Sequence, residues 1–409
     1  MSDQVKRILY AIIFTLAILG IAFLIWFVFF RRPAEEAPPA EVVPGEGAAL
    51  PTVEELLNNA NVAPPEEAVF IGVPGVDIVA AGGLTASNIL TPDVKAMDPT
   101  IAKDGSMRYY NPDDDKFYRV DENGNITQIG TASFPEVDNV SWAPTTNEAI
   151  VEFPDGTNVY YDFDRNKQVT LPKEYEEFSF SPSSDEIAFK YMHIDPERRV
   201  LAVSNPDGSG ARTIESLGEN AHQVQVEWSP TGNVIATNAE FIDGTRQEVG
   251  FIGTKGENFK GTIVEGSGLQ YDYSPDGEQM LYSVYSQNSD YKPGLWIVDS
   301  NGDNIGKNRT ELNINTFASK CTFGGSSSVY CGVPTEQKYG YGLSPGVLDG
   351  IPDEIYKIDT NTGSRTRIAV PVNANGSSVY SVETMNISAD GHTLYFTDAT
   401  TGEIIKISI

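Results

Sequence analysis

Short apolar strands separated by polar turns recur along the chain, and a common phrase precedes many of them. The phrase is an aromatic or aliphatic residue, then Ser-Pro or a related pair, then a turn and a strand. Copies begin at Trp142, Phe180, Trp228 and Tyr273, and a divergent copy begins at Ile387. Their steps are 38, 48, 45 and 114 residues, and the last step is wide enough for one more copy. A period of roughly 40–50 residues built from short strands is typical of a β-propeller with one four-stranded blade per repeat.

A second pattern can be aligned independently of the phrase. It is a run of apolar or aromatic residues in the position of a third strand, and six of its copies are followed by a turn rich in Gly, Asn or Asp. These residue types tolerate the left-handed backbone of tight hairpins. The pattern predicts seven blades, whose third strands contain Phe117, Val159, Val200, Val249, Leu295, Ile355 and Ile404.

The end of the sequence predicts how the ring closes. The last blade has three strands and reaches Ile409 without a fourth, which would leave an unpaired edge. We expect Thr85–Thr91 to pair with Ile404–Ile409 and fill that edge. The first blade then begins near Val94, and the concealed phrase begins at Cys321. The predicted fold is an all-β, seven-bladed propeller over residues 85–409, closed by an N-terminal strand.

The residues before the propeller differ in composition. Ile8 to Phe30 are uncharged and mostly apolar, a length that spans a bilayer as a helix. We therefore expect a cytoplasmic tail at 1–7 and a single transmembrane helix at 8–30 that serves as an uncleaved signal anchor. Residues 31–84 are rich in Pro, Glu and Ala and predict a disordered linker that holds an extracytoplasmic propeller off the membrane. The flanking basic residues are balanced, so the orientation rests on the short tail, the lack of Lys and Arg from Pro33 to Val94, and the cysteine pair.

The two cysteines are separated by a hairpin-like segment with a Gly/Ser turn. Residues equidistant from such a turn face each other on adjacent strands. Cys321 and Cys331 are therefore expected to form a disulfide in an oxidising compartment, with two buried thiols as the alternative. A zinc site is disfavoured because no histidine lies near them.

Charge limits the classes of partner. The net charge of −29 argues against nucleic acid, which requires clustered Lys and Arg. It is compatible with a simple solvated surface or with attraction of basic partners or divalent cations.

The phrase at Tyr273, Ser-Pro-Asp-Gly, and the later Ile297-Val-Asp-Ser-Asn-Gly resemble the propeller repeats of the TolB family, also called PD40 or WD40-like repeats. The resemblance covers roughly residues 85–409 and implies a propeller. It says little of function, because such repeats occur in scaffolds, peptidases and sugar-active proteins. We expect no counterpart of the additional α/β domain of TolB, and the apolar N-terminal segment is a further difference, so the envelope-integrity role of TolB is not carried over.

No catalytic set is apparent. Gly342-Leu-Ser344-Pro345-Gly346 has the spacing of a nucleophile elbow, but Pro345 lacks the N–H that the oxyanion hole needs. The three histidines, His193, His222 and His392, are far apart in sequence. We expect no cofactor. Calcium at Asp299–Asn304 or Asn111–Asp115 is the alternative to ordinary turns there, and the calcium-loop pattern is incomplete.

The longest departure from the repeat is the insertion Pro334–Pro352. Extra loops on a rigid scaffold often carry binding, and Tyr339 and Tyr341 are the binding residues that we expect there. We therefore expect a membrane-anchored module that binds or scaffolds an envelope protein, peptide or glycan, not an enzyme. The alternative is a propeller hydrolase or lyase that acts on a polymer at the ring's central opening, which clustered carboxylates there would favour.

Overall fold

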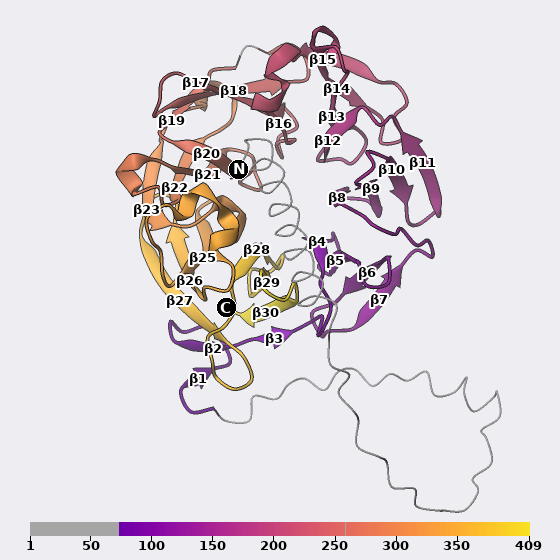
Figure 1. The fold of residues 1–409 in the computed structure, drawn as a ribbon. Helices are drawn as coiled ribbons and strands as arrows, with labels where there is room; N and C mark the ends of the chain where they lie inside the picture. The colour runs from indigo at the N-terminus through magenta and orange to yellow at the C-terminus, as the bar shows by residue number, and fades with distance from the viewer. Residues whose placement is uncertain (1–72, 258) are drawn as a thin grey trace, which may run out of the picture. The chain divides into compact units, whose positions relative to one another are not determined.

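The computed structural model describes residues 73–257 and 259–409, and these form a β-propeller. Figure 1 shows the sheets following one another around a ring, with β8 and β12 on its inner side and β11 and β15 on its outer side. The sheets are antiparallel except for the contacts of β1 and β2. The propeller fold expected from the repeat period is therefore present.

In the described part of the chain, six sheets have four strands each. Five of them are formed in chain order, by β4 (Met97–Ile101), β5 (Met107–Asn111), β6 (Lys116–Val120) and β7 (Ile126–Ile129); β8 (Asn139–Trp142), β9 (Glu148–Glu152), β10 (Asn158–Asp162) and β11 (Lys167–Leu171); β12 (Tyr175–Phe180), β13 (Ile187–Tyr191), β14 (Val200–Ser204) and β15 (Arg212–Ser216); β16 (Val224–Val226), β17 (Val234–Phe241), β18 (Gln247–Gly253) and β19 (Thr262–Val264); and β20 (Ser267–Tyr273), β21 (Gln279–Tyr285), β22 (Gly294–Asp299) and β23 (Thr310–Asn315). The sixth combines β28 (Val382–Ile387), β29 (Thr393–Asp398) and β30 (Ile404–Ser408) with β3 (Asn88–Ile89) from the beginning of the ring.

The remaining sheet has six strands. It contains β24 (Cys321–Phe323), β25 (Ser328–Pro334), β26 (Asp353–Asp359) and β27 (Arg365–Val372), and its outer edge is extended by β2 (Leu84–Ala86) and β1 (Val76–Asp77). Seven short 3-10 helices lie in the connections of the described residues: η1 (Pro196–Arg198), η2 (Gly218–Gln223), η3 (Gln287–Ser289), η4 (Gly302–Asn304), η5 (Ala318–Lys320), η6 (Tyr341–Leu343) and η7 (Pro345–Leu348).

The predicted fold class, with seven like blades, is wrong. Residues 73–257 and 259–409 form six regular four-stranded blades, and the other sheet has six strands. The cause is β27, which is eight residues long. Its first part pairs with β26, and its last residues pair in parallel with β2, Leu84 opposite Val370 and Ala86 opposite Val372. The repeat pattern covers only the four strands of each unit and does not reveal this addition.

The predicted closing segment is divided between two sheets. Only Asn88 and Ile89 pair with β30, opposite Lys406 and Ile405. Thr85, which we expected on the same edge, instead lies in β2 against β27. The Leu90 amide donates a hydrogen bond to the Ile404 carbonyl oxygen and the hydroxyl of Thr91 accepts one from the Ile404 amide, each at 2.8 Å, and these contacts extend the closure beyond β3.

The predicted membrane-spanning segment, residues 8–30, lies outside the described residues, as do the tail 1–7 and residues 31–72 of the expected linker. Across 73–257 and 259–409 the structure contains no helix with the length and apolar character needed to span a membrane. Residues 76–86, which we assigned largely to the linker, contain β1 and β2.

The recurring phrase has a local structural role that explains its residues. In the copy at Tyr273, the buried Ser274 accepts a hydrogen bond from the Gln279 amide at 2.9 Å and donates one to Asp276 Oδ1 at 2.6 Å. Gly277 has a φ of 69°, in the left-handed region that glycine adopts without strain. The phrase therefore forms the hairpin between the first and second strands of a blade.

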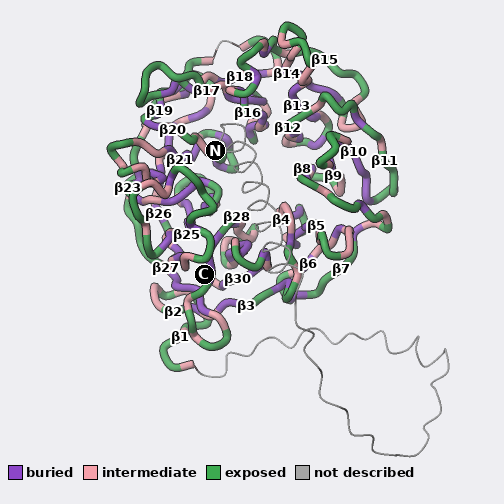
Figure 2. Tube along the Cα trace, in the orientation of Figure 1, coloured by how far each residue is buried: buried purple, intermediate pink, exposed green. Residues whose placement is uncertain are grey.

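The core lies between neighbouring sheets. Each hydrophobic cluster combines side chains of two successive sheets, as where Phe117 packs with Trp142 and Phe163 at ring distances of 5.4 and 5.0 Å. One cluster joins Tyr395 and Ile404 of the last sheet to Met107 of the first. Figure 2 shows that the buried residues follow the middle strands, whereas the outer strands and connections are largely exposed.

Candidate functional site at the inner strands and the insertion loop

The first strands of the sheets, which lie nearest the ring axis, carry polar residues at a fixed offset from the phrase. Three positions before the phrase's first residue, or the equivalent Ile101 in β4, the chain has Asp98, Asn139, Glu177, Gln225 and Gln270. Asp98 and Glu177 have φ values of 47° and 54°, and both lie at register shifts of their strands. Such a backbone is costly for non-glycine residues, which makes these positions candidates for function.

Asp98 and a second polar residue of the inner strands, Ser179, connect neighbouring sheets. Asp98 Oδ2 accepts a hydrogen bond from the Val140 amide at 2.8 Å. Ser179 Oγ accepts one from the Trp228 amide at 2.9 Å. Both amides belong to the inner part of the next sheet, where a four-stranded blade has no fifth strand to satisfy its edge. The inner polar residues therefore fix the spacing of the blades around the axis.

Four carboxylates gather where the inner strands begin: Asp98, Asp138, Glu152 and Glu383. Burial, followed by the charges of Glu383 and Asp138, raises the pKa of Asp98 to about 6, although the Val140 amide opposes the rise. Burial also raises the pKa of Glu152, with the charges of Asp138 and Asp98 adding to it. Within the described residues none of the four takes part in an ion pair. Lys95 opposes the rise of the Glu383 pKa without forming an ion pair with Glu383, so this acidic cluster remains a local excess of negative charge.

A second pair of carboxylates lies closer to the opposite end of the inner strands. Glu227 and Asp272 each occupy the position immediately before a phrase. Burial and then the charge of Asp272 raise the pKa of Glu227 well above its ordinary value, and the neighbouring Tyr271 opposes the rise. The inner strands thus present acidic groups at two levels.

The insertion Pro334–Pro352 packs on the adjacent sheet. The Gly340 and Gly342 amides donate hydrogen bonds to the carbonyl oxygens of Asp290 and Tyr291, at 2.9 and 2.7 Å. A Cβ at Gly342 would lie only 2.6 Å from Tyr285 Cβ and 2.7 Å from the Tyr291 carbonyl oxygen, so the close approach requires glycine. The insertion is consequently held against the β21–β22 connection.

The two tyrosines that we expected to bind have different surroundings. Tyr339 is 70% exposed, and its ring lies edge-on to Tyr291 with centroids 5.5 Å apart. Tyr341 begins η6 and is half-buried. Leu343 and Val347 are 58% and 48% exposed. The insertion therefore presents apolar surface, with Tyr339 as its most exposed aromatic side chain.

The insertion ends beside the acidic cluster. Ser381 Oγ donates a hydrogen bond to the carbonyl oxygen of the buried Leu348 at 3.2 Å. The charge of Asp349 follows burial among the causes that raise the pKa of Glu383, two residues beyond Ser381. The end of the insertion therefore adjoins the acidic cluster.

The base of the insertion is fixed by a buried ion pair. Lys320 Nζ lies 2.9 Å from Asp353 Oδ2, and the side chains are 7% and 0% exposed. The same oxygen accepts a hydrogen bond from the Val382 amide at 2.6 Å. Asp353 therefore links β26 to both η5 and β28.

Other residues considered from the sequence lie apart from this surface. Cys321 and Cys331 are directly paired across β24 and β25 and form a disulfide. Ser344 precedes η7 in an exposed connection. His193, His222 and His392 lie in connections of three different sheets, so the structure does not bring them together.

The two turns considered for calcium use their oxygens locally. Asp299 Oδ2 accepts a hydrogen bond from Asn308 Nδ2 at 2.8 Å, and Asp115 Oδ1 accepts one from the Tyr110 hydroxyl at 3.2 Å. In the part of the chain that the structure describes, no group of three or more His, Cys, Asp or Glu side chains has an arrangement that could hold a metal ion.

The acidic cluster was not found from the sequence. A usable signal was present, because polar residues recur at the same offset from each phrase. It was hidden because the chain has 57 acidic residues, and most of them face solvent. Only the ring brings Asp98 and Glu383, 285 positions apart, within electrostatic range.

Comparisons with known proteins support the fold and no family. No protein-family model and no curated protein matches the chain. Among solved structures, an oligogalacturonate lyase from Vibrio parahaemolyticus is similar, with 11% identity, a TM-score of 0.52, and coverage of 79% of this chain and 93% of that one. Hydrazine synthase from Kuenenia stuttgartiensis has 13% identity and a TM-score of 0.50 over 78% and 97% of the two chains.

The tricorn protease is also similar, with 10% identity and a TM-score of 0.51. The match covers 79% of this chain and 34% of the protease chain, so this chain spans about a third of that protein. At such identities the likeness concerns the propeller fold alone.

Proposed function

We propose that the chain is a propeller binding module that recognises a basic segment of another protein through the acidic cluster and the adjoining insertion. The observation that carries the proposal is the excess of carboxylates at Asp98, Asp138, Glu152 and Glu383. Burial, followed by the charges of Glu383 and Asp138, raises the pKa of Asp98 to about 6, and no cation is among the groups that oppose the rise. A Lys or Arg side chain of a partner would supply that compensation.

The exposed apolar residues of the insertion support a protein as the ligand. Protein interfaces combine aromatic anchors with complementary charge at their edges. Tyr339 packs edge-on against Tyr291, and its ring offers a large contact area with few rotatable bonds to immobilise on binding. The combination fits a Lys- or Arg-containing segment with an apolar residue better than it fits a free metal ion.

We further propose a TolB-like origin and an extracytoplasmic location for this module. The Ser-Pro-Asp-Gly phrase at Tyr273 supports the former. The disulfide between Cys321 and Cys331 supports an oxidising compartment, and the apolar segment 8–30 supports attachment to a membrane. Fractionation of cells, with protease accessibility of the propeller from outside, tests this location.

The binding proposal is tested with the full-length protein and two fluorescent peptides, one alternating Lys with Leu and one alternating Glu with Leu. Fluorescence anisotropy should detect binding of the Lys peptide, weakened by salt and weakened further as the pH falls through about 6, where Asp98 becomes protonated. Glu383→Gln and Tyr339→Ser should each weaken binding about tenfold.

Glu215→Gln is the matched control, because Glu215 is an exposed carboxylate on the outer strand β15. It removes the same charge away from the acidic cluster and should leave the affinity unchanged. Equal affinity for the two peptides, or equal loss in the Glu215 and Glu383 variants, would contradict the proposal.

The second candidate is a hydrolase or lyase for a polymer. The specific observation in its favour is the pKa of Asp98, because a carboxyl group that titrates near neutral pH suits general acid–base catalysis. Incubation with envelope polysaccharide should then release new reducing ends or unsaturated products, and Asp98→Asn should abolish the release. Product formation that is unchanged in Asp98→Asn would remove Asp98 from consideration.

A further inference from the structure

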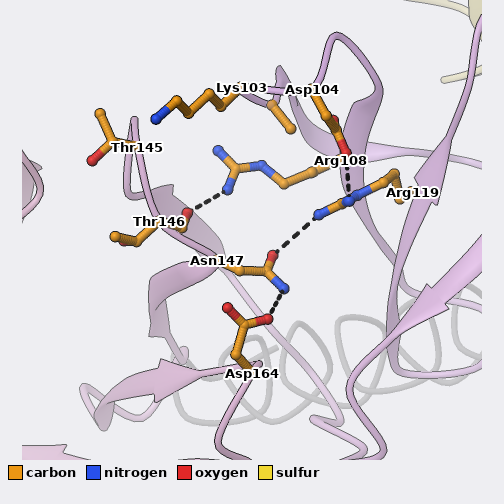
Figure 3. A pocket seen from close by; sticks show the side chains of 9 residues that line it. Lys103, Asp104, Arg108, Arg119, Thr145, Thr146, Asn147 and Asp164 are labelled. Atoms are coloured by element: carbon orange, nitrogen blue, oxygen red, sulfur yellow. Dashed lines mark hydrogen bonds and ion pairs between the residues drawn. The ribbon is translucent and has the colours of Figure 1, made fainter.

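A pocket of about 560 Å³ lies between the first two blades, at the end of the sheets opposite the acidic cluster. Its walls come from the hairpin turns after β4 and β8 and from the adjoining ends of β5, β6 and β10. Figure 3 shows the side chains of Arg108, Arg119 and Lys103 on one side and of Asn147 and Asp164 below them. Three cationic side chains thus line one pocket, together with the carboxylates of Asp104 and Asp164, in a chain whose net charge is −29.

Arg108 is the unusual member. It is only 2% exposed, yet within the described residues it forms no ion pair with a carboxylate. Its Nη1 and Nη2 donate hydrogen bonds to the carbonyl oxygens of Thr146 and Ala143, each at 3.0 Å, and its Nε has no hydrogen-bond partner in the part of the chain that the structure describes. A buried guanidinium is normally paired with an anion, because burial of an isolated charge is costly.

The surroundings hold Arg108 in position for a ligand. Its guanidinium carbon lies 4.7 Å from the centre of the Trp142 ring, and Trp142 Nε1 donates a hydrogen bond to the Asp98 carbonyl oxygen at 2.9 Å. Because two of the five N–H groups of Arg108 bind backbone oxygens, its plane is fixed. Asp104 attracts the guanidinium without forming an ion pair with it, so the charge of Arg108 is only partly offset.

The second arginine, Arg119, uses only some of its N–H groups in contacts with other side chains. Arg119 Nη1 lies 2.6 Å from Asp104 Oδ2, and Arg119 Nη2 lies 3.5 Å from Asn147 Oδ1. The side chains of Arg119 and Asp104 are 33% and 52% exposed, so this ion pair is solvent-screened and weak. Lys103 is exposed and forms no ion pair among the described residues.

We infer that this pocket binds a small hydroxylated molecule bearing one carboxylate or phosphate group. The oxyanion lies between Arg108, Arg119 and Lys103, and it supplies the charge partner that Arg108 lacks. Asn147, whose Nδ2 donates to Asp164 Oδ1 at 2.9 Å, and the Asp164 carboxylate provide partners for ligand hydroxyl groups. The volume accommodates a molecule of the size of a monosaccharide acid or a sugar phosphate.

The test uses the full-length protein with three probes: inorganic phosphate, gluconate, and glucose as the neutral counterpart of gluconate. Isothermal titration calorimetry should detect binding of phosphate or of gluconate, and glucose should bind at least tenfold more weakly than gluconate. The anion that binds tells whether the site takes phosphate or carboxylate. Absence of heat with both anions at millimolar concentration overturns the inference.

Variants locate the site. Arg119 and Lys103 are accessible, so Arg119→Gln and Lys103→Gln should preserve the fold, and each should lower the affinity for the anion about tenfold or more. Lys167→Gln removes the same charge from the exposed strand β11 and should leave the affinity within twofold. Equal weakening by all three variants, or by none, overturns the inference.

Arg108→Met tests the buried cation, with thermal unfolding as its control for folding. If Arg108→Met is folded, it should lose anion binding; retained affinity in the folded variant overturns the role of Arg108. This outcome is independent of the peptide experiment, because Glu383 and Tyr339 do not line this pocket.

Discussion

Replacement of Lys320 by Met removes one partner of the buried ion pair at the base of the insertion. At 2.9 Å, and with an effective dielectric constant of about 20, the Lys320–Asp353 attraction is about 6 kcal/mol, most of it offset by the desolvation of the two groups. Loss of one partner leaves Asp353, 0% exposed, as an uncompensated charge. Such losses cost about 3–5 kcal/mol. We therefore expect Lys320→Met to be destabilised by about that amount.

Thermal unfolding measures this cost. An unfolding entropy of about 2.1 cal/mol/K per residue gives roughly 0.7 kcal/mol per kelvin for a ring of this size, so Tm should fall by about 4–7 °C. The double variant Lys320→Met/Asp353→Asn should recover most of the loss, because the amide side chain removes the charge and keeps an acceptor for the Val382 amide. Lys357→Met is the matched control, since Lys357 is exposed on the same sheet, and it should change stability by less than about 1 kcal/mol.

The pH dependence gives an independent check. Burial raises the pKa of Asp353 above its ordinary value of 3.8, and Lys320 opposes the rise, so the pKa should be higher still in Lys320→Met. A raised pKa means that the folded state holds the proton more tightly than the unfolded chain does, and the resulting stability is lost as the pH rises through the raised pKa. The deficit of Lys320→Met should therefore shrink as the pH is lowered toward 4. A deficit below about 1 kcal/mol at pH 7, or one that does not change with pH, would refute the reasoning.

Three further predictions concern the rest of the ring. In the parent protein, ionisation of Asp98 should lower stability by about 1–3 kcal/mol as the pH rises from the ordinary pKa of 3.8 to about 6, and Asp98→Asn should remove this loss. The Tm of Asp98→Asn should therefore exceed that of the parent at pH 7 and match it near pH 4, and a parallel decrease at both pH values would contradict the pKa of Asp98. Replacement of Cys321 and Cys331 by Ser should lower the free energy of unfolding, measured in urea, by about 2–3 kcal/mol, because the disulfide closes a short loop between residues ten positions apart in the unfolded chain. Stability equal to that of the parent under oxidising conditions would exclude a contribution of the disulfide. Ile404→Ala should lower the free energy of unfolding by about 2–5 kcal/mol, because it opens a cavity between the last and first sheets, whereas the exposed Ile263→Ala should lower it by well under 1 kcal/mol. Similar losses in the two variants would show that Ile404 does not support ring closure.

Much of the fold could be predicted because each blade repeats its own local chemistry. The phrase at Tyr273 marks a hairpin whose serine, aspartate and glycine have fixed hydrogen-bonding and backbone roles, and these roles depend only on neighbours in sequence. The third strands aligned from Phe117 to Ile404 all lie in the third strands of the sheets. The pairing of Cys321 with Cys331 follows in the same way from their equal distance to one turn.

The two errors concern an edge that sequence periodicity does not describe. Thr85 and Asn88 are three residues apart, and both belong to a stretch that favours a strand. Each residue pairs with β27 or with β30 according to which of these strands has an unpaired outer edge within reach, and this is a property of the assembled ring. The same reason explains the six-stranded sheet.

The sequence by itself determined the repeat, its turns and the chain's acidic character, because these depend on residues close together along the chain. The tertiary structure decided which of the many charges are isolated. Asp98 shares an acidic cluster with Glu383 only across the closed ring, and Arg108 becomes a buried cation only because the next blade covers it. Electrostatic energy depends on distance and burial in space, and neither can be read from the spacing of residues in the sequence.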